Sequence, residues 1–145
     1  MIVKRVSPNE ADALVKEEGY VYVDVRSIPE FDAGHTAGAY NIPLMHATAA
    51  GMRANGDFMS VVGAVFSTDT KLVLGCRSGN RSLRAAQALS AAGFEHVVDQ
   101  RAGHSGARDA FGQVQEAGWE GAGLEVATEA HPDRAYEALL ARRDR

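Results

Sequence analysis

A strand, a loop and a helix can be assigned to residues 71–93, KLVLGCRSGNRSLRAAQALSAAG, and this unit contains the chain's only cysteine, Cys76. Its first five residues, KLVLG, are apolar after Lys71 and end in glycine, which suits a buried strand of a parallel sheet. From Ser82 onward, leucine and alanine recur at helical spacing until Gly93, which predicts an amphipathic helix. The pattern therefore places residues 76–81 in a loop between a buried strand and a helix N-terminus.

The loop that begins at Cys76 has the composition of an anion-binding site. Backbone N–H groups at a helix N-terminus lack carbonyl partners and lie at the positive end of the helix dipole. That setting, with arginines nearby, can lower a cysteine pKa from about 8.5 to between ~3.5 and 7.5, and the thiolate is the nucleophile. A lone cysteine among apolar neighbours is usually a small buried hydrophobe, but these neighbours are polar. We therefore predict Cys76 as the catalytic residue and its neighbours as the substrate-binding residues: Arg77, Ser78, Gly79, Asn80, Arg81 and Ser82.

The rest of the chain predicts an α/β fold with a parallel sheet. A strand over residues 2–6 precedes a capping box at Ser7 to Glu10, a helix that ends near Gly19, and an aromatic and β-branched strand over 20–25. Such an order suggests a right-handed crossover. Further elements are expected as a strand within 39–42, a short covering helix within 45–67, a strand over 95–99 and a helix over 132–143. The length suits one domain over 1–145, in which 120–145 is a C-terminal extension that ends in a helix.

Asp24 and Arg26 stand at the carboxyl end of the strand over residues 20–25, where open α/β sheets place their ligand crevices. The alternative is an ion pair or a cap that fixes the loop. For Arg26 we favour an ion pair with Glu30, four residues further on. For Asp24 both interpretations stay open. We predict both residues as supporting residues of the site.

Composition excludes several function classes. The formal net charge is −4 and the pI is near 5.7, so we expect no binding to nucleic acid or to anionic membranes. No apolar run approaches the roughly 18 residues of a membrane span. One cysteine cannot form an internal disulfide and no signal-like segment opens the chain, so we expect a cytoplasmic protein. The five histidines show no close ligand spacing and there is no second thiol, so we expect neither a metal nor a cofactor.

Two segments resemble the rhodanese family of sulfurtransferases. One is DVRSIPEFDAGHTAGAYNIPL, from Asp24 to Leu44, and the other is the loop CRSGNRS, which follows a predicted strand. The resemblance covers about residues 20–99. It implies a single rhodanese-like domain whose central, mostly parallel sheet of about five strands has helices on both faces. It also assigns His35 to a structural turn, rather than to catalysis.

The resemblance implies a thiosulfate sulfurtransferase activity. Such an enzyme moves a sulfane sulfur from thiosulfate or a similar small anionic donor to cyanide or a thiol, through a persulfide on Cys76. An acceptor protein is a further partner that it allows. Loop amides would stabilise the terminal sulfur anion, and Arg77 and Arg81 would hold the donor by bidentate contacts.

Three other functions use a similar sequence. Cysteine-loop phosphatases and arsenate reductases carry an arginine six positions after the cysteine, but here Arg81 is at position five and Ser82 at position six. A non-catalytic sulfur carrier or interaction module would look nearly the same as the enzyme. A redox sensor would have no second cysteine to resolve a sulfenic acid.

The resemblance weakens over residues 100–119. Family members often have paired glycines and a nearby tryptophan there, whereas this chain has Gly103, Gly106 and, well downstream, Trp119. The far wall of the pocket is therefore not assigned from the sequence. We expect His104, Ser105 and Arg108 to be solvated loop residues rather than residues of the pocket entrance. We assign no chemistry to residues 45–67.

Overall fold

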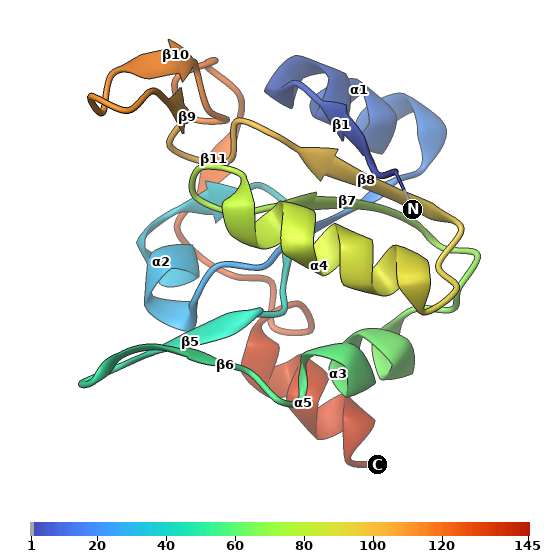
Figure 1. Ribbon diagram of the computed structural model, residues 1–145. Helices are drawn as coiled ribbons and strands as arrows, with labels where there is room; N and C mark the ends of the chain where they lie inside the picture. The colour runs from blue at the N-terminus through green and yellow to red at the C-terminus, as the bar shows by residue number, and fades with distance from the viewer. Residues whose placement is uncertain (1) are drawn as a thin grey trace.

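The computed structural model describes residues 2–145 and is built on a five-stranded sheet (Figure 1). All four neighbouring strand pairs are parallel, which confirms the predicted α/β fold. The order places β7, which leads to Cys76, in the middle of the sheet. Across the sheet the strands are β1 (Lys4–Val6), β8 (His96–Gln100), β7 (Lys71–Gly75), β2 (Val21–Asp24) and β4 (Tyr40–Asn41).

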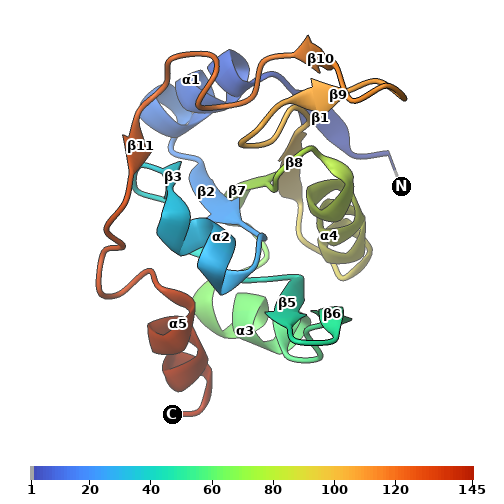
Figure 2. The same cartoon turned by 90° about the vertical axis from the view of Figure 1, so that its left-hand side faces the viewer.

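Helices cover both faces of the sheet. Helices α1 (Pro8–Glu18) and α2 (Ile28–Ala33) pack on one face, and α3 (Phe58–Val65), α4 (Asn80–Ala91) and α5 (Tyr136–Arg143) pack on the other. Figure 2 shows α1 and α4 on opposite sides of the strands. Each face has its own apolar core, because successive side chains of a strand point to opposite sides.

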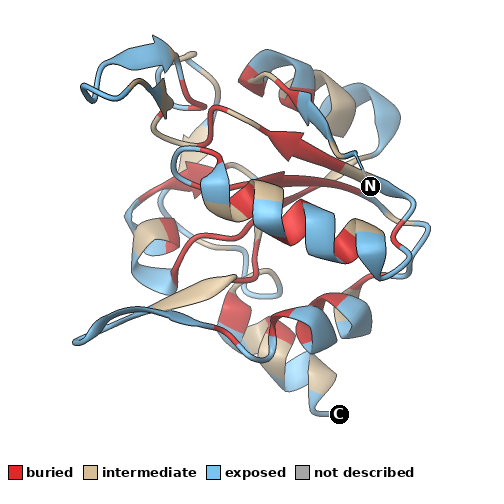
Figure 3. Ribbon diagram, viewed as in Figure 1, coloured by how far each residue is buried: buried red, intermediate tan, exposed pale blue. Residues whose placement is uncertain are grey.

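Strand β7 shows how the two cores share one strand. Leu72 and Leu74 belong to the core under α4, whereas Val73 belongs to the core under α1. All three are fully buried, and Figure 3 shows the central strands buried along most of their length. Cys76 lies at the edge of the α4 core. The loop that begins at Cys76 therefore follows a fully buried central strand.

The first helix begins and ends as predicted. The Glu10 N–H donates to Ser7 Oγ at 3.1 Å, and the Ser7 N–H donates to Glu10 Oε1 at 3.0 Å, which completes the capping box. Gly19 ends the helix with a left-handed φ of 74°.

Helix α4 begins earlier than its apolar pattern indicates. Its N-cap is Gly79, with a φ of 104°, so Asn80, Arg81 and Ser82 lie in the first helical turn and not in the loop. The apolar pattern indicates a start at Ser82, because residues 77–82 carry no large apolar side chain before Leu83. The loop proper is therefore residues 76–79.

The prediction for residues 45–67 was incomplete. The expected short helix is present as α3, but an antiparallel hairpin precedes it, formed by β5 (Met45–Thr48) and β6 (Gly51–Ala54). Thr48 Oγ1 accepts from the Ala50 N–H and donates to the Gly51 carbonyl, which holds the tight turn. The hairpin has few large apolar residues, so its sequence resembles a loop.

Four short strands and a long connection complete the chain. Strand β3 (His35–Thr36) pairs with β11 (Val126–Ala127), and β9 (Ala107–Arg108) pairs with β10 (Val114–Glu116). After β11 the chain runs along the edge strand β4, where the Asn41 N–H donates to the Arg134 carbonyl at 2.9 Å. This contact holds residues 131–135 out of the helix, so α5 begins at Tyr136 and not at Pro132 as predicted. Within residues 2–145, no helix combines the length and the apolar character needed to cross a bilayer.

Replacing Leu139 by alanine will lower the free energy of unfolding by about 2–4 kcal/mol, because Leu139 of α5 is fully buried in the core that contains α3. Urea denaturation measures the loss. The exposed Arg142→Gln, on the same helix, should change it by less than about 0.5 kcal/mol. Equal effects for the two variants would mean that α5 does not pack on this core.

Candidate active site at Cys76

The Cys76 thiol lies under a backbone amide. Cys76 directly follows β7 and is only 2% exposed. The Gly79 N–H donates to its sulfur at 3.1 Å, and the thiol contacts Ser82 Oγ at 3.4 Å. Ser82 Oγ in turn donates to the Gly79 carbonyl at 3.3 Å. The sulfur is thus buried but has polar partners, as a site that stabilises a sulfur anion requires.

Only glycine can hold this amide in place. Gly79 has a left-handed φ of 104°, and a Cβ there would lie 2.2 Å from the Arg101 carbonyl oxygen. A similar contact fixes Gly103, whose Cβ would lie 2.5 Å from the Arg77 carbonyl. The loop and the segment after β8 are therefore in backbone contact at two points, which side chains would force apart.

The segment after β8 also binds the loop by hydrogen bonds. The His104 N–H donates to the Cys76 carbonyl at 2.7 Å, and the Ser105 N–H donates to the Arg77 carbonyl at 2.9 Å. These two carbonyls are therefore occupied. His104 and Ser105 are half-buried parts of the site wall, which corrects the expectation that they are solvated loop residues; Arg108 is exposed, as expected.

Arg81 forms an ion pair with Glu30. Glu30 was the predicted partner of Arg26. The guanidinium donates to both carboxylate oxygens, at 2.7 and 2.9 Å. Partial burial raises the pKa of Glu30, but the hydrogen bonds from Arg81 and Ser27 outweigh it and bring that pKa to about 2. The helix α4 is thereby tied to α2, and this guanidinium is held at the first turn of α4.

Arg77 is the arginine of the loop with a free guanidinium. Its side chain is exposed and has no hydrogen bond or ion pair with any residue from 2 to 145. Ser78 and Asn80 are exposed beside it. Of the two arginines predicted to hold a donor, Arg77 is therefore the one available to solvent.

Asp24 and Arg26 form a buried pair with each other, so the predicted Arg26–Glu30 ion pair is wrong. Arg26 Nη2 donates to Asp24 Oδ2 at 2.7 Å and to the Gly34 carbonyl at 2.7 Å. Asn41 Nδ2 donates to the Asp24 and Arg26 carbonyls. These hydrogen bonds fix the end of β2 beside the loop.

The charge of Arg26 also acts on the neighbouring His104. Burial lowers the pKa of His104, and the positive charge of Arg26 lowers it further.

His35 has a structural role, as predicted. Its ring stacks on Phe31 with 3.7 Å between ring centroids, and Nδ1 lies 2.8 Å from the Phe31 carbonyl oxygen. The ring is buried within the turn between α2 and β4.

Asp99 was missed by the sequence analysis. This carboxylate, at the end of β8, is buried and accepts from Arg5 Nε at 2.7 Å, while its Oδ1 has no hydrogen-bond partner among residues 2–145. Burial raises its pKa, whereas Ser82 and Arg5 oppose that shift. The sequence held a signal for Asp99, because the predicted strand over 95–99 places it at the carboxyl end of the sheet, as the earlier strand over 20–25 does for Asp24.

Trp119 returns to the site despite its distance in sequence. Its backbone N–H donates to the Gly103 carbonyl at 2.8 Å, and its ring packs edge-on against Tyr22 at 5.3 Å between centroids. Gly118 lies against Gly106, since a Cβ at Gly118 would be 2.4 Å from the Gly106 nitrogen. The β9–β10 hairpin therefore begins and ends at adjacent points of the backbone, beside the segment that contacts the Cys76 loop.

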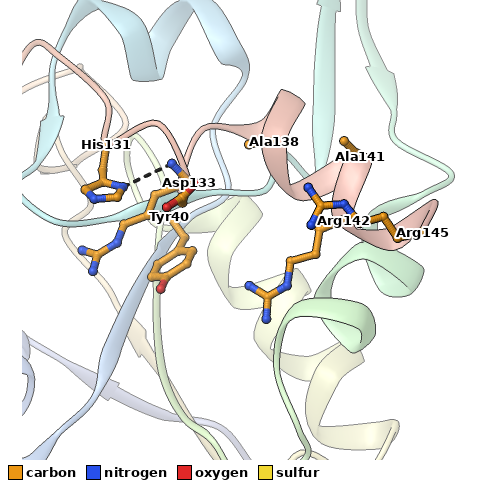
Figure 4. Close-up of a pocket in the computed structure, with 8 residues that line it drawn as sticks. Tyr40, His131, Asp133, Ala138, Ala141, Arg142 and Arg145 are labelled. Carbon is orange, nitrogen blue, oxygen red and sulfur yellow. Dashed lines mark hydrogen bonds between the residues drawn. The ribbon is translucent and has the colours of Figure 1, made fainter.

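Another cavity lies away from the sulfur. Its volume is about 480 Å³. Figure 4 shows some of the residues that line it, among them Tyr40, His131 and the α5 residues Ala138 and Arg142. None of the residues that line it belongs to the Cys76 loop. We assign it no part in the chemistry of the thiol.

A family model and individual relatives match the chain. The model for the rhodanese-like domain matches residues 7–108. Thiosulfate sulfurtransferase 16, chloroplastic, from Arabidopsis thaliana is 42% identical over 87 residues, which are 60% of this chain and 72% of that protein. Senescence-associated protein DIN1 from Raphanus sativus is 39% identical over 88 residues, and the match spans 61% of this chain but only 48% of that protein.

Solved structures agree on the fold. The crystal structure of Rv0390 from M. tuberculosis superposes with a TM-score of 0.73 and 24% identity, over 89% of this chain and 100% of that one.

Gly79→Ala will disrupt the loop, because the added Cβ meets a backbone carbonyl and the residue has a positive φ. We expect a loss of at least about 2 kcal/mol of unfolding free energy, measured by urea denaturation. Gly63→Ala is the control: Gly63 lies within α3, and a Cβ there meets nothing within 4 Å. This control should be neutral or up to about 1 kcal/mol stabilising.

The Arg81–Glu30 pair will make stability depend on pH. The pKa of Glu30 falls from 4.5 to about 2 on folding, so its stabilising contribution is fully present above pH 4.5 and is lost as the pH falls toward 2. The difference in unfolding free energy between the wild type and Glu30→Gln should therefore be largest above pH 4.5 and shrink at lower pH. Denaturant titrations from pH 6 to pH 3 measure it, and a constant difference would contradict the pairing.

Proposed function

The chain belongs to the rhodanese-like domain family, and on that basis we propose that it is a thiosulfate sulfurtransferase that uses Cys76. A sulfane sulfur would pass from thiosulfate, or a similar small anionic donor, to cyanide or a thiol. The observation that carries the proposal is the Gly79 amide, which points at the Cys76 sulfur from 3.1 Å. An amide donor in this position stabilises negative charge on sulfur, first in the thiolate and then in the persulfide.

The reaction has two balanced steps. In the first, the Cys76 thiolate attacks the outer sulfur of thiosulfate, the S–S bond of the donor breaks and sulfite leaves with the electron pair. In the second, cyanide attacks the terminal sulfur of the persulfide and leaves as thiocyanate, which returns the thiolate. With a thiol as acceptor, the product is a new persulfide that keeps the proton of the thiol. No cofactor or metal enters either step.

The two arginines of residues 76–82 would have different roles. Arg77 is exposed and free, so it would attract and hold the oxyanion end of the donor. Arg81 would act mainly by fixing the first turn of α4 through Glu30, in addition to its charge near the thiol. Asp24 and Arg26 would support the loop from the adjacent strand end. A lone thiol with this chemistry suits a reducing compartment such as the cytoplasm.

The loop favours sulfur over phosphate. A phosphatase loop needs a guanidinium that wraps a tetrahedral phosphate, but Arg81 is one position too early and is bound to a carboxylate. Only 2% of Cys76 is exposed, which suits small or slender reactants. A dedicated sulfur carrier would have the same site but would give no turnover with free cyanide.

Thiosulfate will convert the purified protein into a form about 32 Da heavier, the mass of one sulfur atom, and Cys76→Ser will not change mass. Mass spectrometry of the intact protein measures the adduct, and thiocyanate formation measures turnover. Cys76→Ser should keep the wild-type circular dichroism spectrum. Phosphate-ester hydrolysis without the adduct would contradict sulfur transfer, and the adduct without thiocyanate would identify a carrier.

A further inference from the structure

A second cavity adjoins the Cys76 loop on the side of the β9–β10 hairpin. It measures about 410 Å³ and is lined by Arg5, Ser78, Asn80, Arg101, Arg108 and Glu116. Ser78 and Asn80 flank Gly79, the residue whose amide contacts the sulfur. The other four residues come from β1, the segment after β8, and the hairpin. The hairpin therefore forms one side of a cavity beside the Cys76 loop.

One arginine of the cavity has no carboxylate partner among residues 2–145. Three arginines and one glutamate line the cavity, and two of these arginines are paired with carboxylates. Arg5 is bound to Asp99, and Arg101 donates to both oxygens of Glu116 at 2.9 and 2.8 Å. Arg108 donates only to the Gly112 carbonyl, at 2.9 Å, and has no carboxylate partner among residues 2–145. One guanidinium is therefore available for the carboxylate of a ligand.

Gly79 separates this cavity from the sulfur. Its N–H is 3.1 Å from the Cys76 sulfur, and its carbonyl is 3.4 Å from Arg5 Nη2, which lines the cavity. The sulfur and the cavity therefore lie against opposite polar groups of the Gly79 backbone. The outer sulfur and the oxygens of thiosulfate are only two bonds apart, so this donor has no arm that extends around the backbone. A thiol whose carboxylate is several bonds from its sulfur can reach both.

We propose that the cavity binds the carboxylate of a small, extended thiol that accepts the sulfur, with Arg108 as its main contact. This inference rests on the proposed sulfur transfer. It makes the hairpin a specificity element for the second step, in which the acceptor's sulfur takes the terminal sulfur of the persulfide while its carboxylate stays beside Arg108.

Two matched thiols test the proposal. With thiosulfate as donor and sulfite release as readout, 6-mercaptohexanoate should show a kcat/KM at least about fivefold above that of 6-mercaptohexanol, an effect of the size of one charge-assisted contact. The preference should reside in the KM for the acceptor, with the KM for thiosulfate unchanged. If the two thiols react equally, or if the KM for thiosulfate changes instead, the cavity does not bind the acceptor.

Substitutions in the cavity should change the preference for the acid in opposite directions. Arg108→Gln should remove this preference, whereas Arg108→Lys should keep most of it. Glu116→Gln should increase the preference, because it releases Arg101 from its carboxylate partner. Arg142→Gln, which removes one exposed arginine on α5, controls for the change in net charge and should leave the preference intact. A preference that survives Arg108→Gln overturns the proposal.

A binding measurement separates this proposal from the proposed function. In the Cys76→Ser variant, 6-mercaptohexanoate should shift the backbone amide resonances of Ser78 and Arg108, whereas 6-mercaptohexanol should not. This readout needs no turnover. Shifts without any thiocyanate formation by the wild type would support the cavity and reject the sulfurtransferase. Thiocyanate formation by the wild type without these shifts would support the sulfurtransferase and reject the binding of the acceptor in the cavity.

Discussion

The hydrogen bond from the Gly79 N–H to the Cys76 sulfur is the contact on which the site depends. It exists because Gly79 has a positive φ and because its missing Cβ lets the Arg101 carbonyl approach. The same turn starts α4, so the amide that meets the sulfur also lies at the positive end of the helix dipole. Backbone packing, more than any single charged side chain, therefore sets the environment of the thiol.

The main features of the fold, and the position of Cys76 in a polar loop after a buried strand, could be predicted from local pattern. The apolar run before Gly75 indicated a buried strand, the capping box at Ser7 indicated the start of α1, and the run YVYVDV indicated a central strand. Each signal lies within a few residues, and local backbone preferences decide it. Cys76 was singled out because polar and basic residues follow it in a place where a core cysteine would have apolar neighbours.

The side-chain partners could not be predicted in the same way, because they depend on how distant segments pack. Arg26 and Glu30 are spaced for a helical pair, yet Asp24 takes Arg26 at the strand end and Arg81, 51 residues away, takes Glu30. The early start of α4 was hidden because Gly79 acts through its φ angle and carries no apolar signal. Trp119 lies beside Gly103 because the β9–β10 hairpin begins and ends at adjacent points, and this contact has no signal in the local sequence.

Backbone contacts close the base of the β9–β10 hairpin. Gly106 and Gly118 are in backbone contact, and the Trp119 backbone N–H donates to the Gly103 carbonyl. These contacts use no side chain of residues 107–117. Side-chain changes within the hairpin should therefore alter its outer surface and leave the backbone around the thiol in place.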